Sequence, residues 1–330
     1  MSDGGWGTAI SLALLKRNRD VVLWGPFPKY IDEMRESRVN RQFLAGVDLP
    51  EALEFTADAS TAITGADFIV MAAPTRFARG CLKTIRDAGL PAQARIVSVA
   101  KGIENGTLMR VSEMCAELLP GVPYTVLSGP SHAEEVALEI PTAVVAASTD
   151  SAMASEVQEL FMSDVFRVYT SDDVVGVELG GALKNVFAIA AGVCDGMEFG
   201  DNTKAALVTR GIAEMGRLGN ALGGRVETFS GLSGLGDMIV TCCSGHSRNR
   251  HVGEQLGRGK SLAEITESMG RVVAEGVTTA ESAHELAQKV GVTCPIISEI
   301  YAGLYQSKDP RQGLRDLMTR AARSEREDFG

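Results

Sequence analysis

A lysine and an asparagine stand side by side inside an otherwise apolar stretch of the sequence. Lys184 and Asn185 interrupt the range Val174–Met197, which is rich in glycine, alanine and valine and also carries Glu178. Polar groups in such surroundings cost free energy unless they have partners or a task. A lysine that is desolvated on an apolar helix can have its pKa lowered toward neutrality, which makes it a usable general base. The same pattern also fits a lysine that extends from a buried helix to its edge.

Cations at two further places are candidates for binding phosphate. Lys101 follows the apolar run Ile96–Ala100, at the carboxyl end of an expected strand, where ligands of open α/β sheets collect. Ser247, Arg248 and Asn249 precede a helical pattern, and arginine can bind phosphate oxygens in a bidentate way while hydroxyl, amide and helix N–H groups add neutral donors. Both patterns also occur as a solvated loop lysine and as a plain helix cap.

For two acidic residues, a purely structural role is the alternative to a functional one. Asp237 follows the glycine-rich turn Gly231–Gly236 and precedes an apolar run, a position typical of a helix cap. Glu275 lies between Ala274 and Gly276, where it could accept hydrogen bonds from a ribose or an amide, or remain a solvated loop glutamate.

Four residues that can bind zinc occur within ten positions: Cys242, Cys243, His246 and His251. Adjacent cysteines do not easily occupy two corners of one tetrahedron, and the spacing matches no usual zinc site. We therefore predict no metal centre.

The chain begins with a glycine-rich segment that leads into an amphipathic helix. Gly4 and Gly7 have the spacing of the last two glycines in G-x-G-x-x-G, where the backbone approaches a pyrophosphate at a helix N-terminus. Ser2 fills the first glycine position, and the strand that normally precedes this loop is absent. The next predicted strand runs on into Trp24–Phe27, which holds neither an acid nor an arginine, so coenzyme preference stays open.

Strand-like and helix-like segments alternate through the first half of the chain. The β-rich runs are Val21–Trp24, Phe68–Ala73, Arg95–Val99, Thr125–Leu127, Thr142–Ala147 and Phe166–Tyr169. The helical patterns are clearest at Gly7–Lys16, Arg76–Ala88, Leu108–Leu118 and Ala152–Phe161. Such alternation predicts an α/β domain with a doubly wound, Rossmann-type parallel sheet at residues 1–173. Beyond it the β-rich runs stop, and residues 174–330 are predicted to form an all-helical substrate and catalytic domain.

Composition narrows the class of protein. The 330 residues are 45% hydrophobic and 22% charged, which indicates an ordinary globular protein with enough apolar material for two cores. A net charge of -10 argues against nucleic acid or an anionic membrane as the main partner. Six cysteines without framework spacing, a polar start and no apolar run long enough to cross a bilayer favour a soluble, cytoplasmic protein.

Seven short motifs occur in a fixed order along the chain: Gly4–Ala9, Lys101–Glu104, Ser128–Ser131, Leu179–Asn185, Gly234–Asp237, Ser247–Asn249 and Ala274–Gly276. Together they resemble the bacterial type of NAD(P)-dependent glycerol-3-phosphate dehydrogenase over essentially the whole chain. The resemblance implies hydride transfer between sn-glycerol 3-phosphate and dihydroxyacetone phosphate, with the active site in the cleft between the domains. It further implies a cytoplasmic role in supplying glycerol 3-phosphate for phospholipids, and an enzyme that can form a homodimer.

Carried over residue by residue, the resemblance makes Lys184 the general base. The residues that it places around the glycerol phosphate are Lys101, Gly129, Ser131, Asp237, Ser247, Arg248 and Asn249. Those that it places at NAD or NADP are Gly5, Trp6, Lys101, Ala133, Arg248, Val273 and Glu275.

Two other functions remain open at this point. The missing strand and Ser2 suggest a non-catalytic nucleotide-binding remnant. Alternatively, the same chemistry could act on another short hydroxy acid or phosphorylated alcohol.

Overall fold

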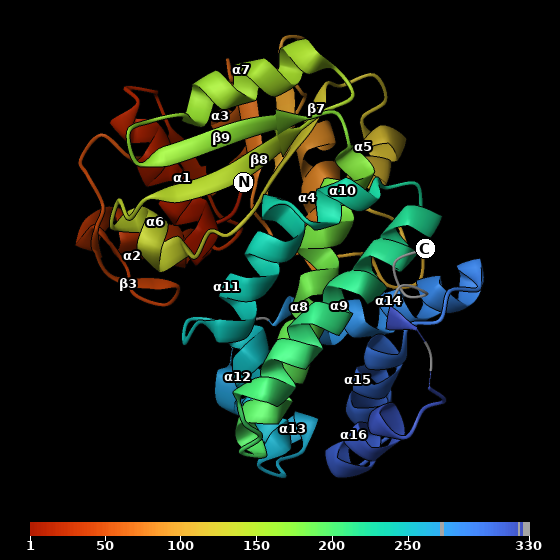
Figure 1. Cartoon of the computed structure of the whole chain (residues 1–330). Coiled ribbons are helices and arrows are strands. Elements are labelled where there is room, and N and C mark those ends of the chain that lie inside the picture. Colours follow the sequence, from red (N-terminus) through yellow and green to blue (C-terminus); the bar gives the residue numbers. More distant parts are fainter. Residues whose placement is uncertain (271–273, 323, 326–330) are drawn as a thin grey trace. The chain divides into compact units, whose positions relative to one another are not determined.

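The computed structural model describes residues 1–270, 274–322 and 324–325. They divide into two compact units (Figure 1). The first unit consists of Met1–Ala100 and Val111–Val174, and the second consists of Lys101–Arg110 and Val175–Gly330. The short segment 101–110 therefore belongs with the helical unit, although it precedes residue 173 in the chain.

A five-stranded sheet with the order β5-β6-β7-β8-β9 forms the centre of the first unit. Its strands are β5 (Phe68–Met71), β6 (Arg95–Ser98), β7 (Tyr124–Ser128), β8 (Thr142–Ala147) and β9 (Phe166–Ser171). Each strand is a β-rich run of the sequence, and the side chains of Val97, Leu127, Val144 and Val168 are buried in the core of this unit. The predicted α/β class with a Rossmann-type sheet is confirmed.

One pair of strands departs from the predicted parallel arrangement. The pairs β5–β6, β6–β7 and β8–β9 are parallel, but β7 and β8 run antiparallel, with Leu127 opposite Ala146. The connection between these two strands contains only the five-residue helix α6 (Ala133–Ala137). Parallel neighbours are usually joined through a full crossover helix, and the connection here contains no helix of that length.

Two short pairs of strands accompany this sheet. Strand β1 (Val22–Trp24) pairs in parallel with β4 (Glu54–Thr56), and β2 (Val39–Asn40) pairs antiparallel with β3 (Leu44–Asp48). Met1 and Ser2 connect β1 to β5: the Ser2 N–H donates to Trp24 O at 3.1 Å, and Met1 O accepts from the Ala72 N–H at 3.3 Å. These two residues lie where the sequence predicts that a strand is missing.

The helices of the first unit are α1 (Gly5–Lys16), α2 (Pro28–Ser37), α3 (Ala59–Ile63), α4 (Thr75–Asp87), α5 (Val111–Leu118), α6 and α7 (Ser151–Phe161). The four long helical patterns of the sequence correspond to α1, α4, α5 and α7. Sequence reasoning missed α2, α3, α6 and β2–β4, because α2 is largely polar and the other elements are too short to show a clear hydrophobic periodicity.

The second unit contains only helices among its described residues. They are α8 (Val174–Gly196), α9 (Asp201–Ala221), α10 (Val226–Phe229), the π-helical turn η1 (Leu232–Gly236), α11 (Asp237–Cys243), α12 (Arg248–Gly257), α13 (Leu262–Met269), α14 (Glu275–Val290), α15 (Pro295–Tyr305) and α16 (Pro310–Met318). Helix α8 is long and apolar enough to cross a membrane, but 94% of its most apolar window is buried within the protein, as in the core helix of a globular domain.

Glycines bring the backbones of α8 and α12 into direct contact. A Cβ atom added at Gly192 would lie 1.9 Å from Arg250 O, and one added at Gly253 would lie 1.9 Å from Ile189 O. No side chain other than hydrogen fits at such distances. This contact fixes the start of α12 against the helix that carries Lys184.

Candidate active site

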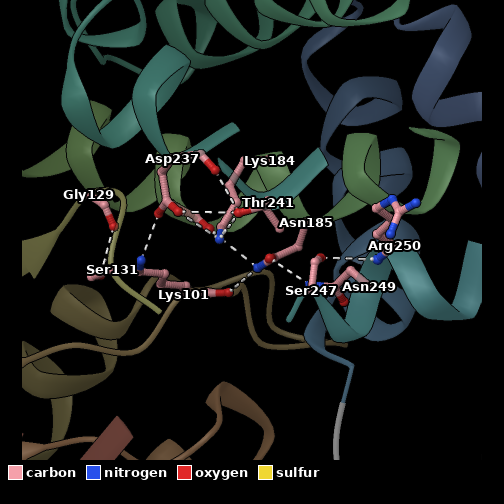
Figure 2. Close-up of polar contacts among 11 residues, drawn as sticks. Lys101, Gly129, Ser131, Lys184, Asn185, Asp237, Thr241, Ser247, Asn249 and Arg250 are labelled. Carbon is pink, nitrogen blue, oxygen red and sulfur yellow. Dashed lines mark hydrogen bonds and ion pairs between the residues drawn. The ribbon is translucent and has the colours of Figure 1, made fainter. Parts of the chain in front are cut away.

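Two lysines from different parts of the sequence meet at one carboxylate in the second unit (Figure 2). Lys101 Nζ lies 2.7 Å from Asp237 Oδ2, and Lys184 Nζ lies 2.9 Å from Asp237 Oδ1. The side chain of Asp237 is 2% exposed and that of Lys184 is 8% exposed. Lys184 therefore points into the cluster and does not extend to the edge of the helix.

Burial and charge act against each other in this cluster. Burial on its own raises the pKa of Asp237, but the ammonium groups of Lys101 and Lys184 outweigh it and lower that pKa below its usual value. Burial lowers the pKa of Lys101, because desolvation outweighs the attraction of Asp237. The positive charge of Lys184 beside the same carboxylate adds to this lowering of the Lys101 pKa. Such a site is suited to proton transfer.

A glycine-rich turn positions the aspartate. The π-helical turn η1 ends at Gly236, and Asp237 is the first residue of α11. A Cβ at Gly180 on α8 would lie 2.7 Å from Ser233 O, so this turn packs closely against the helix that carries Lys184. The local interpretation of Asp237 as a helix cap is wrong: Gly236 holds the cap position, and the carboxylate binds lysines instead.

Thr241 is a member of the cluster that the sequence reasoning missed. Its hydroxyl accepts from Lys184 Nζ at 2.6 Å and donates to Asp237 O at 2.6 Å. Thr241 lies four residues after Asp237 on the same helix, which puts both side chains on one face. The four-residue spacing between Asp237 and Thr241 could have identified Thr241 from the sequence. Thr241 lies in an apolar run, however, and was not considered as a functional residue.

Asn185 connects the cluster to the start of α12. Its side-chain amide donates to Lys101 O at 2.9 Å and to Gly181 O at 3.3 Å. Its oxygen accepts from the amide of Asn249 at 2.8 Å, and Asn249 Oδ1 accepts from the Gly276 N–H at 2.8 Å. The sequence drew attention to Asn185 as a buried polar residue but assigned it no role.

The first turn of α12 has one buried and one exposed candidate side chain. Ser247 is the N-cap, and its hydroxyl accepts from the Arg250 N–H at 3.2 Å, as the sequence pattern predicts. Asn249 is buried, whereas Arg248 is exposed at the first helical position. Arg250 binds Asp195 on α8 through its Nε at 2.6 Å and so serves a structural ion pair.

Glu275 opens α14, directly before the glycine whose N–H is bound by Asn249. Its charge raises the pKa of Lys101, against the larger effect of burial. Val273, the other coenzyme residue predicted in this region, lies outside the described residues.

In the first unit, three predicted coenzyme residues gather at the start of α1. The helix begins at Gly5, with Gly4 as the N-cap. A Cβ at Gly5 would lie 2.4 Å from Phe43 O and 3.8 Å from the Cβ of Ala133, which opens α6. The indole Nε1 of Trp6 is buried and has no hydrogen-bond partner within the protein. A tight glycine turn, a helix N-terminus and a spare buried donor fit the binding of a dinucleotide.

The other two candidates of the first unit follow β7. Gly129 has a φ of +144°, and a Cβ there would lie 2.9 Å from the Cα of Val144, so the position requires glycine. The Ser131 hydroxyl donates to Gly129 O at 2.8 Å. Both residues lie at the carboxyl end of a sheet strand, where ligands of α/β folds bind.

Among the described residues, no group of three or more histidine, cysteine, aspartate or glutamate side chains is arranged to hold a metal ion. All six cysteines are free thiols. Burial raises the pKa of Cys242 to about 12, which keeps it protonated and unsuited to binding zinc.

Comparison with known proteins gives one consistent result. The N-terminal family model of NAD-dependent glycerol-3-phosphate dehydrogenase matches residues 1–154, and the C-terminal model matches residues 173–315. The chain is 50% identical to the NAD(P)+ glycerol-3-phosphate dehydrogenase of Geobacter sulfurreducens, over 98% of this chain and 97% of that protein. The corresponding protein of Geobacillus kaustophilus is 49% identical, over 99% and 95%. The crystal structure of glycerol-3-phosphate dehydrogenase from Coxiella burnetii superimposes with a TM-score of 0.92 at 38% identity, covering 96% of this chain and 97% of that one.

Proposed function

The chain belongs to the family of NAD-dependent glycerol-3-phosphate dehydrogenases, and from that premise we propose how its residues share the work. It is an NAD(P)-dependent oxidoreductase that interconverts sn-glycerol 3-phosphate and dihydroxyacetone phosphate, and in the reducing direction it supplies glycerophospholipid synthesis. We assign dinucleotide binding to residues 1–173. Substrate binding and catalysis we assign to residues 174–330 together with Lys101.

One part of the coenzyme site would lie at the start of α1. Gly5 lets the backbone approach a pyrophosphate, the helix N-terminus offers N–H groups, and Trp6 Nε1 offers a buried donor. Ala133, Val273 and Glu275 are the further contacts that the family resemblance supports. The nicotinamide, when bound, supplies hydride to the ketone or accepts it from the alcohol.

The cluster of Lys101, Asp237 and Lys184 carries the proposal. Lys184 Nζ takes the proton of the substrate hydroxyl during oxidation and returns it to the carbonyl oxygen during reduction. Asp237 and Thr241 hold Nζ in place from two sides. Lys101 provides a second positive charge that stabilises the alkoxide as it forms.

The phosphate group of the substrate requires donors outside this cluster. Arg248 is exposed at the first position of α12, where a free-standing guanidinium and the helix N-terminus both favour an anion. We assign the phosphate to Arg248 and Ser247, and we assign Gly129 and Ser131 to the glycerol backbone on the strength of the family resemblance.

The cellular compartment and the oligomeric state are also part of the proposal. The free state of all six cysteines supports a reducing compartment, and so the cytoplasm. The family resemblance supports a homodimer, which light scattering in solution would reveal as twice the mass of the 35.0-kDa chain.

The test is the rate of NADH or NADPH oxidation by the purified chain with dihydroxyacetone phosphate, compared with dihydroxyacetone, which lacks the phosphate. We expect phosphate-dependent turnover, and the ratio of kcat/KM for the two coenzymes gives the preference. Lys184→Met should lower kcat by at least about 10³-fold, because the proton then has no acceptor of suitable geometry. Lys289→Met removes an exposed lysine of α14 and should leave kcat unchanged.

Equal rates with the phosphorylated and the unphosphorylated ketone would contradict the substrate assignment. Full activity of Lys184→Met would remove Lys184 as the base. Absence of turnover with either coenzyme would favour the non-catalytic nucleotide-binding protein.

A further inference from the structure

One buried acidic residue of the long core helix α8 has no part in the cluster of Lys101, Asp237 and Lys184. The side chain of Glu178 is 5% exposed, and its Oε2 accepts from Arg110 Nη1 at 2.8 Å. Arg110 is the last residue of the segment 101–110, which begins at Lys101. Such a buried ion pair is difficult to open, because the carboxylate would lose a countercharge where water hardly reaches. The far end of the segment is therefore held firmly to α8.

The segment 101–110, which we call the Lys101 loop, is closed at its base by its own backbone. The Glu104 N–H donates to Met109 O at 3.0 Å, and the Leu108 N–H donates to Glu104 O at 2.9 Å. The first of these bonds joins the peptide group between Ile103 and Glu104 to the peptide group between Met109 and Arg110. Arg110 therefore lies next to Ile103, and a displacement of Arg110 reaches Lys101 through a short stretch of chain.

Helix α8 holds the Lys101 loop at two places. At the near end Lys101 O accepts from the side-chain amide of Asn185 at 2.9 Å, and at the far end Arg110 binds Glu178 (Figure 2 shows the near end). Glu178 and Asn185 are seven residues apart, so they lie on one face of the helix, about 10 Å apart along its axis. The same helix carries Lys184. Thus α8 supplies one lysine of the cluster and clamps the loop that supplies the other.

The interior of the Lys101 loop is packed but strained. Ile103 is 3% exposed within the core of the helical unit, and Leu108 packs against that core. Leu108 has a φ of +61°, a left-handed conformation that costs free energy for a residue with a side chain. Such a conformation persists only where the surroundings hold it. We therefore expect the loop to relax when its far end is released from α8.

We propose that the Glu178–Arg110 ion pair is a positioning pair for Lys101. It holds the Lys101 loop so that the ammonium group stays 2.7 Å from Asp237 Oδ2 while the substrate reacts. This inference rests on the proposed function, in which Lys101 stabilises the alkoxide. Glu178 lies about 9 Å along the axis of α8 from Lys184, so it acts on the reaction through the loop.

Four substitutions separate the roles. Glu178→Gln removes the charge and keeps the size of the side chain, and the guanidinium of Arg110, which is 17% exposed, can then turn toward water. Arg110→Lys keeps a cation and is the conservative variant. Arg110→Gln breaks the same contact from the loop side and replaces Glu178→Gln if that variant does not fold. Glu117→Gln makes the same change in an Arg–Glu pair of the first unit, with Arg79, and is the matched control.

The first measurement is kcat/KM for dihydroxyacetone phosphate, in the wild-type background and in the Lys101→Met background. Lys101→Met should itself lower kcat/KM by about 10²-fold. In the wild-type background we expect a loss of about tenfold for Glu178→Gln, and values within about threefold for Arg110→Lys and Glu117→Gln. In the Lys101→Met background the loss from Glu178→Gln should shrink below about twofold, because no ammonium group remains to be positioned.

The second measurement is hydrogen exchange of the protein without ligands, which does not depend on turnover. In Glu178→Gln the peptide that covers residues 101–110 should exchange at least about fivefold faster, because the bonded N–H groups of Glu104 and Leu108 open more often. The peptide that covers residues 186–196 of α8 should exchange as in the wild type. Glu117→Gln should leave both peptides unchanged.

Equal losses of kcat/KM from Glu178→Gln in the two backgrounds would show that the ion pair acts independently of Lys101, and this would overturn the proposal. Wild-type kcat/KM in Glu178→Gln, or unchanged exchange of the Lys101 loop, would overturn it as well. Any of these results together with wild-type turnover would sink this inference alone. Absence of wild-type turnover would sink the proposed function, and this inference with it.

Discussion

Lys101 and Lys184 bind opposite oxygens of a single carboxylate, at 2.7 and 2.9 Å from Asp237 Oδ2 and Oδ1. The two lysines are 83 positions apart in the sequence, at Lys101 and Lys184, and neither lies in the same element as Asp237. An aspartate shared in this way orients both amino groups, and the site carries one positive charge in excess when both lysines are protonated, as after Lys184 has taken the substrate proton. That excess suits a reaction in which an alkoxide forms and a phosphate is held nearby.

Replacing Thr241 tests how far Lys184 depends on its second partner. Thr241→Val removes the hydroxyl that accepts from Lys184 Nζ, while a side chain of similar shape remains. Asp237 still holds Nζ, so we expect kcat to fall only about 10- to 100-fold, the cost of one lost hydrogen bond to a charged group. Thr241→Ser retains the hydroxyl and should stay within about twofold of wild type. Wild-type kcat in the valine variant would show that Thr241 does not orient the base.

Replacing Arg248 tests the phosphate site. Arg248→Ala should raise KM for dihydroxyacetone phosphate by about 10- to 100-fold, because a charge-assisted hydrogen bond to phosphate is lost. The same variant should reduce unphosphorylated dihydroxyacetone as slowly as the wild type does. Arg258→Ala, at the other end of α12, removes an arginine that pairs with Glu254 and should leave both values unchanged. An unchanged KM for the phosphorylated ketone in Arg248→Ala would rule out the assignment.

The sequence predicted the fold well where apolar periodicity is strong. The long core helix α8 and the strands β5–β9 follow from runs of apolar residues, because burial dictates which side chains such elements carry. The antiparallel pairing of β7 with β8 was not predicted. The connection between these strands contains only a five-residue helix, which the sequence analysis did not identify.

The candidate site was only partly visible in the sequence. Lys184 and Asn185 stood out as polar residues in an apolar helix, and Ser247 as a helix cap. Thr241 was missed, and Asp237 was interpreted as a helix cap. The ion pair between Lys184 and Asp237 joins residues 53 positions apart, so it does not determine which residues stand next to either partner in the sequence. Tertiary contacts of this kind are visible only once α8 and α11 are packed together.

Replacing Gly253 tests the contact between α8 and α12. Gly253→Ala would place a Cβ 1.9 Å from Ile189 O, so the helices must separate. We expect a loss of about 1–3 kcal/mol in the free energy of unfolding and a higher KM for the phosphorylated substrate, because α12 carries Ser247 and Arg248. Gly216→Ala in α9 has open space for the added methyl group and should gain up to about 1 kcal/mol from helix propensity. Equal melting temperatures of the two variants would contradict the close packing of α8 on α12.

Glu214 predicts a pH dependence of stability in the helical unit. Its carboxylate is 1% exposed and accepts from the N–H groups of Ile296 and Ile297 at the start of α15, at 3.0 and 2.9 Å. Burial raises the pKa of Glu214 from 4.5 to about 7, although these two hydrogen bonds pull it down. At a pH between 4.5 and about 7, Glu214 holds a proton in the folded protein that it has lost in the unfolded chain. The free energy of unfolding should therefore fall as pH rises through this window, by about 3 kcal/mol in all.

The contribution of Glu214 is isolated by subtracting the free energy of unfolding of Glu214→Gln from that of the wild type at each pH. Unfolding is followed by circular dichroism at 222 nm and not by tryptophan fluorescence, because both tryptophans lie in the first unit. Glutamine offers one acceptor to two N–H donors, so the variant should be less stable than wild type at pH 5, where Glu214 is protonated and costs no buried charge. Above pH 7 the wild type carries a buried carboxylate and the variant does not, so the difference between them should shrink by about 3 kcal/mol. Glu227→Gln, an exposed position on α10, should follow the wild-type profile throughout. A constant difference between wild type and Glu214→Gln from pH 4.5 to 8 would mean that Glu214 is ionised in the folded protein over this whole range.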